Sequence, residues 1–386
     1  MIEPMTREEI AAVREQPERS SGLPARCYTD PAFYELEKER VFRRSWLGVG
    51  RAEQVSNPGD YFTTDLFGEP VIIVRDKGGT IRALSNVCPH RWMLLVGHDP
   101  EAPIPTKAES CGNRRSFQCP FHLWSFDLDG KMIGAPGMEE AKDFDKLRWS
   151  LPQFAVELWG GFIFVNLDPE AEPLAPQLAT LQPLVEAYEL DRLQMLEPLE
   201  YECNWNWKMS VEAGSESYHH LGLHQDTLEE FMPATLSDIE SPAGPYSIYR
   251  NPTADGSPIP TAFPPPAGLS EQQLSCLTLV TIFPYTMFFS MPEYTAYLQL
   301  IPESFDRHRL RYIPLVHPNV EEFPEPEEFA NIVRATLDVV HQQDMAAGAY
   351  CWAGAQSQVA RPGRRSHLES QLWQMHNWLL DQIENP

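Results

Sequence analysis

The sequence predicts an α+β protein in which a small antiparallel β domain is followed by a larger domain of helices and antiparallel strands. A chain of 386 residues is long for one compact core. Short segments rich in β-branched and aromatic residues, separated by Gly, Pro, Asn or Asp, fill residues 43–168. Helical patterns flank further strand patterns after that range. We therefore expect N-terminal helices over 1–42 that pack on the larger domain, the β domain over 43–168, and the larger domain over 169–386.

The first 46 residues contain two helix start signals. Thr6 precedes an acidic first turn in TREEIAAVREQ, and Asp30 precedes Pro31 in DPAFYELEKERVF. A hydroxyl or carboxylate at the N-cap, followed by Pro or acidic residues, is typical of a helix N-terminus.

The larger domain alternates helical and strand patterns. APQLATLQPLVEAYEL is typical of a helix, and LEPLEYECNWNWKMS of a strand that enters a helix. Residues 241–267 are so rich in Pro and Gly that we expect no regular structure there, which leaves a linker or a loop over a pocket open. Strands resume with LTLVTIFPYTMFFS, TAYLQLIPE and RLRYIPLVH, and long helices end the chain.

The composition excludes several classes of partner. Acidic residues outnumber basic ones 55 to 30, so a nucleic acid or an anionic membrane is not expected as the principal partner. The N-terminus is charged where a signal peptide needs an apolar core, and the apolar run from Leu277 is too short to span a membrane. Seven scattered cysteines favour reduced thiols and metal ligation. We expect a cytoplasmic protein.

Two short loops each offer one cysteine and one histidine. The first supplies Cys88 and His90, and the second supplies Cys119 and His122. Four such ligands could bind zinc in a tetrahedron. Zinc knuckles usually pair cysteine with cysteine, however, whereas mixed pairs suit a 2Fe-2S cluster in which two thiolates bind one iron and two imidazoles the other. Neutral imidazoles raise the potential of such a cluster.

Together with Trp124 and the sequence DLDG, these loops resemble the Rieske domain of the Rieske non-haem iron oxygenases. Trp92 and Leu123 stand where that family commonly has glycine, and the segment between the loops is longer than usual. That segment includes Lys107, Arg114 and Arg115, which could steer an acidic ferredoxin or flavodoxin-like domain toward the cluster.

A second group of ligands lies in NWKMSVEAGSESYHHLGLH, which runs from Asn206 to His224. On a regular helix Glu212, Glu216 and His219 would share a face. His219 and His224 would lie about 140° apart, so a common metal requires a π-type bulge or a helix end, and Gly222 makes a break there inexpensive. Spacing alone favours His220 with His224.

The family resemblance selects among these residues. It implies that His219 and His224 bind iron, and that the carboxylate ligand comes from a late helix, where Asp344 fits the context and Asp338 is the competitor. It also implies that Glu216 hydrogen-bonds His219 and, across a subunit boundary, the cluster ligand His122. Ala213 stands where the family often has Asn.

Two imidazoles and one carboxylate form the facial triad of non-haem oxygenases. The resemblance implies a homotrimeric terminal oxygenase, with one 2Fe-2S cluster and one Fe²⁺ per subunit and a helix-grip (START/Bet v1-like) catalytic domain. Because the chain has no G-x-G-x-x-G after a strand, electrons should come from a separate NAD(P)H-dependent reductase, directly or through a ferredoxin.

The expected reaction is hydroxylation, dihydroxylation or oxidative demethylation of a small organic substrate by dioxygen. An aromatic compound is favoured, and a quaternary ammonium compound stays open. Phe283, Met287 and Phe289 are candidates to line the pocket. The competing functions are a Rieske electron carrier without oxygenase activity and a zinc-stabilised binding module.

Overall fold

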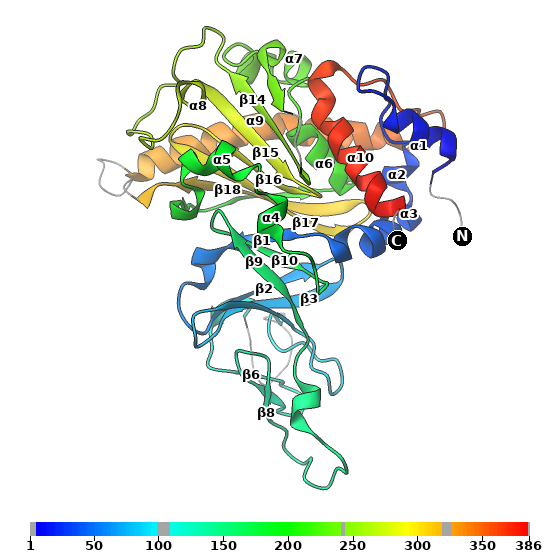
Figure 1. Ribbon diagram of the computed structural model, residues 1–386, viewed down its shortest axis with the longest axis vertical. Helices are drawn as coiled ribbons and strands as arrows, with labels where there is room; N and C mark the ends of the chain where they lie inside the picture. Colours follow the sequence, from blue (N-terminus) through cyan, green and yellow to red (C-terminus); the bar gives the residue numbers. More distant parts are fainter. Residues whose placement is uncertain (1–4, 99–108, 241–243, 319–325, 385–386) are drawn as a thin grey trace. The chain divides into compact units, whose positions relative to one another are not determined.

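The computed structural model describes residues 5–98, 109–240, 244–318 and 326–384 (Figure 1). The chain folds into two compact units. The small unit comprises Gly48–Glu172, and the large unit comprises Met1–Leu47 together with Pro173–Pro386. The chain therefore begins in the large unit, builds the small unit as a continuous insertion, and then completes the large unit.

The small unit is built on antiparallel strands. Its main sheet has seven strands in the order β1-β10-β9-β4-β3-β2-β5, and a second sheet has the order β6-β7-β8. The strands are β1 (Leu47–Arg51), β2 (Asp60–Leu66), β3 (Glu69–Arg75), β4 (Ile81–Ser85), β5 (Cys111–Asn113), β6 (Phe117–Gln118), β7 (Ser125–Phe126), β8 (Met132–Gly134), β9 (Gln153–Trp159) and β10 (Phe162–Asn166). Side chains from both sheets, such as Ile72, Leu84 and Phe126, share one buried core.

The large unit contains an eight-stranded sheet in the order β11-β18-β17-β16-β15-β14-β13, with β12 also paired to β18. The strands are β11 (Gln194–Met195), β12 (Leu199–Cys203), β13 (Asp238–Glu240), β14 (Tyr246–Pro252), β15 (Cys276–Ile282), β16 (Thr286–Ser290), β17 (Tyr294–Ser304) and β18 (Arg307–Val316). The pairs from β13 to β18 are antiparallel. The buried strand pair predicted from Leu277 is confirmed as β15 and β16.

Helices cover this sheet. The longest is α9 (Pro326–Ala355), which crosses the sheet in Figure 1 and contacts α6, β12 and β18. The C-terminal helix α10 contacts α1, α3 and β14. The α-helices besides α9 are α1 (Arg7–Arg14), α2 (Arg26–Thr29), α3 (Pro31–Arg40), α4 (Leu174–Gln177), α5 (Gln182–Val185), α6 (Trp207–Gly214), α7 (His220–Leu223), α8 (Glu271–Leu274) and α10 (Ser370–Glu384).

The N-terminal helices begin where the sequence predicts. Thr6 accepts a hydrogen bond from the Glu9 amide, and Asp30 accepts one from the Ala32 amide with Pro31 in the first turn. Helix α3 is joined to α6 by an ion pair between Glu37 and Lys208, whose side chains are both fully buried. The first 47 residues thus belong to the large unit.

One prediction about the large unit is wrong. We expected no regular structure over 241–267, but Tyr246–Pro252 forms β14, which lies between β13 and β15. Tyr246, Ile248 and Tyr249 supply strand propensity that the flanking prolines do not remove.

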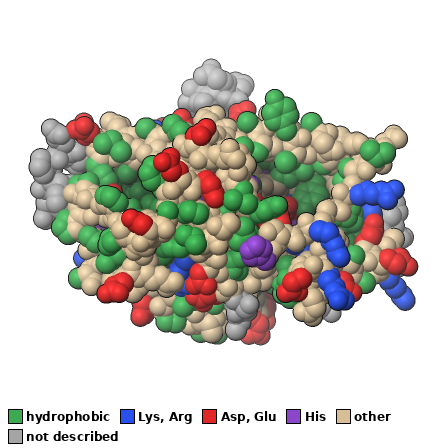
Figure 2. Space-filling model, turned by 90° about the horizontal axis from the view of Figure 1, so that it is seen from above, with side chains coloured by type: hydrophobic (Ala, Val, Ile, Leu, Met, Phe, Trp, Pro, Cys, Tyr) green, Lys and Arg blue, Asp and Glu red, His purple; other side chains and the backbone are tan. Residues whose placement is uncertain are grey.

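The predicted α+β class is confirmed, with antiparallel sheets in both units and a long helix lying across the larger sheet. Within the described part of the chain, no helix is both long and apolar enough to cross a membrane. Figure 2 shows acidic side chains scattered over the face that it presents, with most of the visible Lys and Arg side chains near its right-hand side.

Candidate functional site

The two Cys/His loops of the small unit have the same backbone hydrogen-bond pattern. In the first, the Cys88 amide donates to the Met93 carbonyl, and the Trp92 amide donates to the Cys88 carbonyl. In the second, Cys119 and Leu123 make the equivalent bonds, to the Trp124 and Cys119 carbonyls. Two copies of one tight loop therefore present their cysteine and histidine side chains in the same way.

The four side chains converge as ligands of one group would. Backbone amides of His90 and Arg91 donate to the Cys88 sulfur, and those of Phe121 and His122 donate to the Cys119 sulfur. A hydrogen bond between the two sulfurs raises the pKa of Cys88 and lowers that of Cys119. The amide donors and the shared proton favour thiolate at Cys119, and metal ligation requires thiolate sulfur.

The histidines of these loops have buried nitrogen atoms without partners. The rings of His90 and His122 lie with their centroids 4.5 Å apart, and Trp124 stacks on His90. Both Nδ1 atoms are buried and make no hydrogen bond. Burial, together with the neighbouring His122, lowers the pKa of His90, which favours its neutral imidazole. Two unpaired imidazole nitrogens beside two adjacent sulfurs fit the ligand set of a Rieske 2Fe-2S cluster.

A single zinc ion is the alternative for these loops. Among the described residues, His219, His224 and Asp344 of the large unit form a group that could hold one metal ion, with ligand atoms within 4.8 Å of one another. The Cys/His loops are not part of that group.

Trp92 and Leu123 occupy equivalent positions in the two loops, and both have left-handed backbone conformations, with φ of 60° and 61°. Glycine adopts this conformation without strain, which is the physical reason for glycine at such positions. Both side chains are exposed, Trp92 at 81% and Leu123 at 48%.

The structure describes only part of the basic segment between the loops. Lys107 lies outside the described residues. Arg114 donates to the Tyr61 hydroxyl and lies over its ring, whereas Arg115 is exposed. Steering of an acidic partner by this segment stays a prediction.

In the large unit, the segment from Asn206 to His224 is not one helix. Helix α6 begins at its N-cap Asn206 and ends at Gly214, and α7 is a single turn with His219 as N-cap and His224 as C-cap. A π-helical turn, Gln225–Glu229, follows. The expected helix end near the two histidines is therefore present, but Gly222 does not cause it, because Gly222 lies inside α7.

Helix breakage separates residues that we expected on one face. Glu212 has other partners than His219 and His224: it accepts a hydrogen bond from the Tyr28 hydroxyl and contacts His376. The prediction that Glu212, Glu216 and His219 share a helix face is therefore wrong, since α6 ends between the first residue and the other two.

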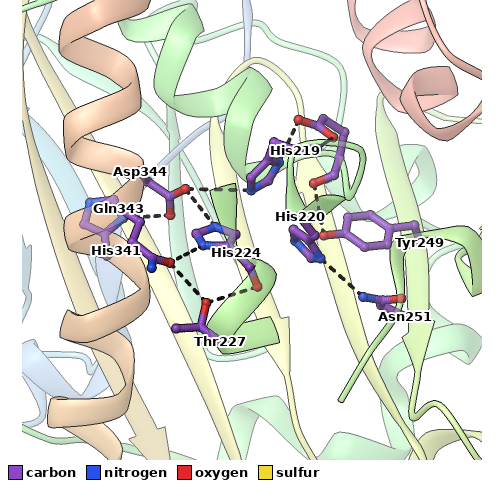
Figure 3. Close-up of polar contacts among 10 residues, drawn as sticks. His219, His220, His224, Thr227, Tyr249, Asn251, His341, Gln343 and Asp344 are labelled. Atoms are coloured by element: carbon purple, nitrogen blue, oxygen red, sulfur yellow. Dashed lines mark hydrogen bonds and ion pairs between the residues drawn. The ribbon is translucent and has the colours of Figure 1, made fainter. Parts of the chain in front are cut away.

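His219, His224 and Asp344 come together from α7 and α9 (Figure 3). Each offers one ligand atom, and these atoms lie within 4.8 Å of one another. The Asp344 Oδ1 atom lies 3.1 Å from His224 Nε2 and 3.7 Å from His219 Nε2. Two imidazole nitrogens and one carboxylate oxygen with this spacing fit the facial triad of a non-haem iron site.

The electrostatics keep this carboxylate ionised. Burial alone would raise the pKa of Asp344, but hydrogen bonds and charge interactions with His224, His341 and His219 outweigh it and lower the pKa. Burial likewise disfavours protonated His219, yet the hydrogen bond and charge of Glu216 raise its pKa. The acidic side chains around these imidazoles therefore favour positive charge at this point, which is the role that a bound cation would take.

The competing residues His220 and Asp338 are not part of this group. Burial and the neighbouring histidines lower the pKa of His220 to about 3, and its Nδ1 faces the Asn251 amide at 3.5 Å. Asp338 accepts hydrogen bonds from the Tyr201 hydroxyl and from Gln342. His220 therefore has the contacts of a buried residue in the cavity wall, and Asp338 those of a carboxylate on the surface of a helix.

Glu216 lies directly behind His219. Its Oε1 atom is 2.7 Å from His219 Nδ1, and its Oε2 accepts the His219 backbone amide. The carboxylate thus fixes the ring so that Nε2 faces Asp344. Such an outer carboxylate orients a metal-bound histidine and raises its basicity.

An apolar cavity of about 140 Å³ opens beside the three donors. Its walls include Leu228, Met232, Tyr249, Leu277, Leu279, Phe289, Met291, Tyr294, Tyr312, Leu337 and Val340. Of the predicted pocket residues, Phe289 lines the cavity. Phe283 instead packs on Trp378, and Met287 lies under Gly214 and Ser215.

Comparison with known proteins places this geometry in a family. Residues 190–385 match the model of the ring-hydroxylating alpha subunit, catalytic domain, and residues 45–154 match that of the Rieske [2Fe-2S] domain. The chain belongs to the ring-hydroxylating alpha subunit family. Its two units therefore correspond to the Rieske domain and the catalytic domain of this family.

Relatives of this alpha subunit include both monooxygenases and dioxygenases. It is 33% identical over 205 residues to the carnitine monooxygenase oxygenase subunit of Escherichia coli K12, which covers 53% of this chain and 52% of that protein. It is 35% identical over 213 residues to the benzene 1,2-dioxygenase alpha subunit of Pseudomonas putida, covering 53% and 44%. The chain spans about half of the length of these curated relatives.

Among solved structures, a quaternary ammonium Rieske monooxygenase bound to an inhibitor matches 99% of this alpha subunit and 100% of its own chain. The TM-score is 0.81 at 22% sequence identity. This likeness supports the fold.

Sequence reasoning missed three residues near the donors of this alpha subunit. Gln343 contacts His224, His341 contacts Asp344, and the Tyr249 hydroxyl approaches the Glu216 carbonyl. Gln343 and His341 could have been found from their positions on α9, since they lie one and three residues before Asp344. Tyr249 could not, because it belongs to the strand that we did not predict.

Proposed function

We propose that this chain is a terminal oxygenase, which uses dioxygen and electrons from a separate NAD(P)H-dependent reductase to hydroxylate, dihydroxylate or oxidatively demethylate a small organic substrate. The convergence of His219, His224 and Asp344 at the wall of an apolar cavity carries the proposal. A facial triad leaves the opposite metal positions open toward such a cavity. The Rieske domain supports the supply of single electrons.

The residues present would hold both groups. Cys88 and Cys119 would bind one iron of the cluster, and His90 and His122 would bind the other through their unpaired Nδ1 atoms. His219, His224 and Asp344 would hold the mononuclear Fe²⁺. When bound, the cluster and the iron supply one-electron transfer and dioxygen activation, respectively.

Glu216 has two roles in this proposal. Within the subunit it accepts the His219 Nδ1 proton and keeps Nε2 available for metal. In a homotrimer it would also contact His122 of the partner subunit, so that one carboxylate would connect the two metal centres across a subunit boundary.

The cavity favours an uncharged aromatic substrate. Among the described residues that line it there is no Lys or Arg, so it offers neither an ammonium nor a guanidinium partner for a carboxylate such as that of carnitine. A dry apolar cavity of about 150 Å³ is large enough for a benzene-sized ligand, and the cavity here is similar, at about 140 Å³. Tyr249, Tyr294 and Tyr312 could instead face a quaternary ammonium group through cation–π contacts, which makes that class the alternative to test.

The electron donor would be a reductase, acting directly or through a ferredoxin, in the cytoplasm. The formal net charge of -25 disfavours nucleic acid as a partner. Exposed Arg115, near the second cluster loop, could contribute to the docking of an acidic donor.

Iron content and isotope incorporation test the proposal. The purified protein should contain three irons per chain, two in the cluster and one in the triad. With a surrogate reductase and a panel of aromatic and quaternary ammonium compounds, ¹⁸O₂ should label a product. Asp344→Ala should keep the cluster and lose the third iron and turnover, whereas the control Asp338→Asn should keep both. Two irons per chain and no product from any substrate would instead identify an electron carrier.

A further inference from the structure

His224 is bonded on both sides by consecutive residues of α9. Its Nδ1 lies 2.6 Å from Gln343 Oε1, and its Nε2 lies 3.1 Å from Asp344 Oδ1 (Figure 3). The ring is almost fully buried, with 1% of its side chain exposed. The two α9 side chains therefore decide how this imidazole is oriented.

Thr227 holds the Gln343 side chain in place. Its hydroxyl lies 3.1 Å from Gln343 Oε1, the same oxygen that faces His224. An amide oxygen has two lone pairs and can accept from both donors. With this oxygen toward the ring, His224 Nδ1 carries a proton, which leaves Nε2, beside Asp344, as the nitrogen that a metal can take. The reversed amide would put the proton on Nε2, where a metal binds.

The two histidines have different outer partners. His219 Nδ1 faces the Glu216 carboxylate at 2.7 Å, whereas His224 Nδ1 faces a neutral amide. A carboxylate acceptor increases the basicity of a metal-bound imidazole more than an amide does. The amide also adds no third negative charge beside Glu216 and Asp344.

We propose that Gln343, supported by Thr227, is a positioning residue that fixes the tautomer and ring orientation of His224 and makes this imidazole a weaker metal donor than His219. The proposal rests on the proposed function only in that the triad binds a divalent metal. It needs neither a substrate nor a reductase, so it can fail or succeed independently of the oxygenase reaction.

Metal binding to the iron-free protein tests the proposal. Gln343→Leu removes the acceptor and should lower the affinity for Co²⁺ about 10–100-fold, the usual effect of losing an outer hydrogen-bond partner. Thr227→Val removes one supporting bond and should lower the affinity about 2–10-fold. Gln343→Glu places a carboxylate acceptor at this position and should bring the affinity at least to the wild-type value. Gln342→Leu is the matched control, because Gln342 bonds Asp338 and is exposed, and it should leave the affinity unchanged.

Proton NMR of the Co²⁺-loaded protein provides a readout that a purely structural role would not change. The wild type and the Gln342→Leu control should each show two exchangeable, paramagnetically shifted N–H signals, one from each ring. Gln343→Leu should lose one signal, or broaden it by faster exchange with solvent.

Retention of both signals and of wild-type affinity in Gln343→Leu would overturn the proposal, as would an equal loss of affinity in Gln342→Leu. If Gln343→Leu does not fold, Thr227→Val decides: wild-type affinity together with unchanged exchange of both N–H signals would overturn the proposal.

Discussion

The buried ion pair between Glu37 and Lys208 allows a quantitative test of how the N-terminal helices are held. Both side chains are 0% exposed, and the Lys208 Nζ atom lies 2.7 Å from Glu37 Oε1. In Lys208→Met the Glu37 carboxylate keeps only the Trp207 indole N–H as a donor. Removing one member of a buried pair costs about 3–5 kcal/mol, so we expect the free energy of unfolding to fall by about that amount.

A double variant separates the loss of the ion pair from the effect of leaving one buried charge without a partner. Glu37→Gln combined with Lys208→Met leaves no buried charge and keeps an acceptor for Trp207, so most of the stability should return, to within about 1 kcal/mol of wild type. Because burial raises the pKa of Glu37, the deficit of Lys208→Met should also shrink as the pH is lowered toward that pKa, where the carboxyl is protonated.

Urea unfolding of the iron-free protein, followed by circular dichroism, measures these effects. Arg14→Met is the control, since Arg14 pairs with exposed Asp381 and should contribute less than about 1 kcal/mol. If Lys208→Met were no more destabilising than Arg14→Met, or the double variant no better than the single, the reasoning would be refuted.

Three further predictions concern other parts of the chain. Trp92→Gly should raise the free energy of unfolding by up to about 1 kcal/mol, because removing the strain of a left-handed φ outweighs the entropy cost of glycine. Phe121→Gly, in the second loop, should lower the free energy of unfolding, because the backbone there has an ordinary φ. Thermal unfolding of the two variants and the wild type measures the difference. Burial lowers the pKa of His308 to about 4, so the unfolded state binds one more proton than the folded state between about pH 4 and 6.5. The free energy of unfolding should therefore fall by about 1.4 kcal/mol for each pH unit of acidification in that range. His308→Gln should remove this contribution to the pH dependence, as measured by urea unfolding at several pH values. Phe289→Ala should enlarge the cavity and increase the ratio of two-ring to one-ring product in a competition assay, and an unchanged ratio would place the substrate elsewhere.

The sequence predicts the candidate ligand residues better than their structural surroundings. Cys88, His90, Cys119 and His122 are visible because mixed Cys/His loops are rare and their chemistry is specific. Asp344 is far from His219 in the sequence, and only the family resemblance connects them. Spacing favoured His220 over His219, because a regular helix was assumed where the chain has a break and a one-turn helix.

What the sequence could not predict depends on long-range packing. Tyr249 lines the cavity because β14 is completed by hydrogen bonds to β13 and β15, and local Pro and Gly content concealed that strand. Gln343 matters through a contact with His224, 119 positions earlier in the chain. Neither contact has a local signature.

Helix α7 is only four residues long, and helical segments of that length do not persist alone in water. His219 and His224 are its N-cap and C-cap, so an ion bound by both residues and by Asp344 would cross-link the two ends of the helix and disfavour its unfolding. The amide hydrogens of Gly222, Leu223 and His224, which bond back to the start of the turn, should then exchange with deuterated solvent more slowly in loaded than in metal-free protein. Loss of the ion would in that case loosen one wall of the cavity as well as abolish the chemistry.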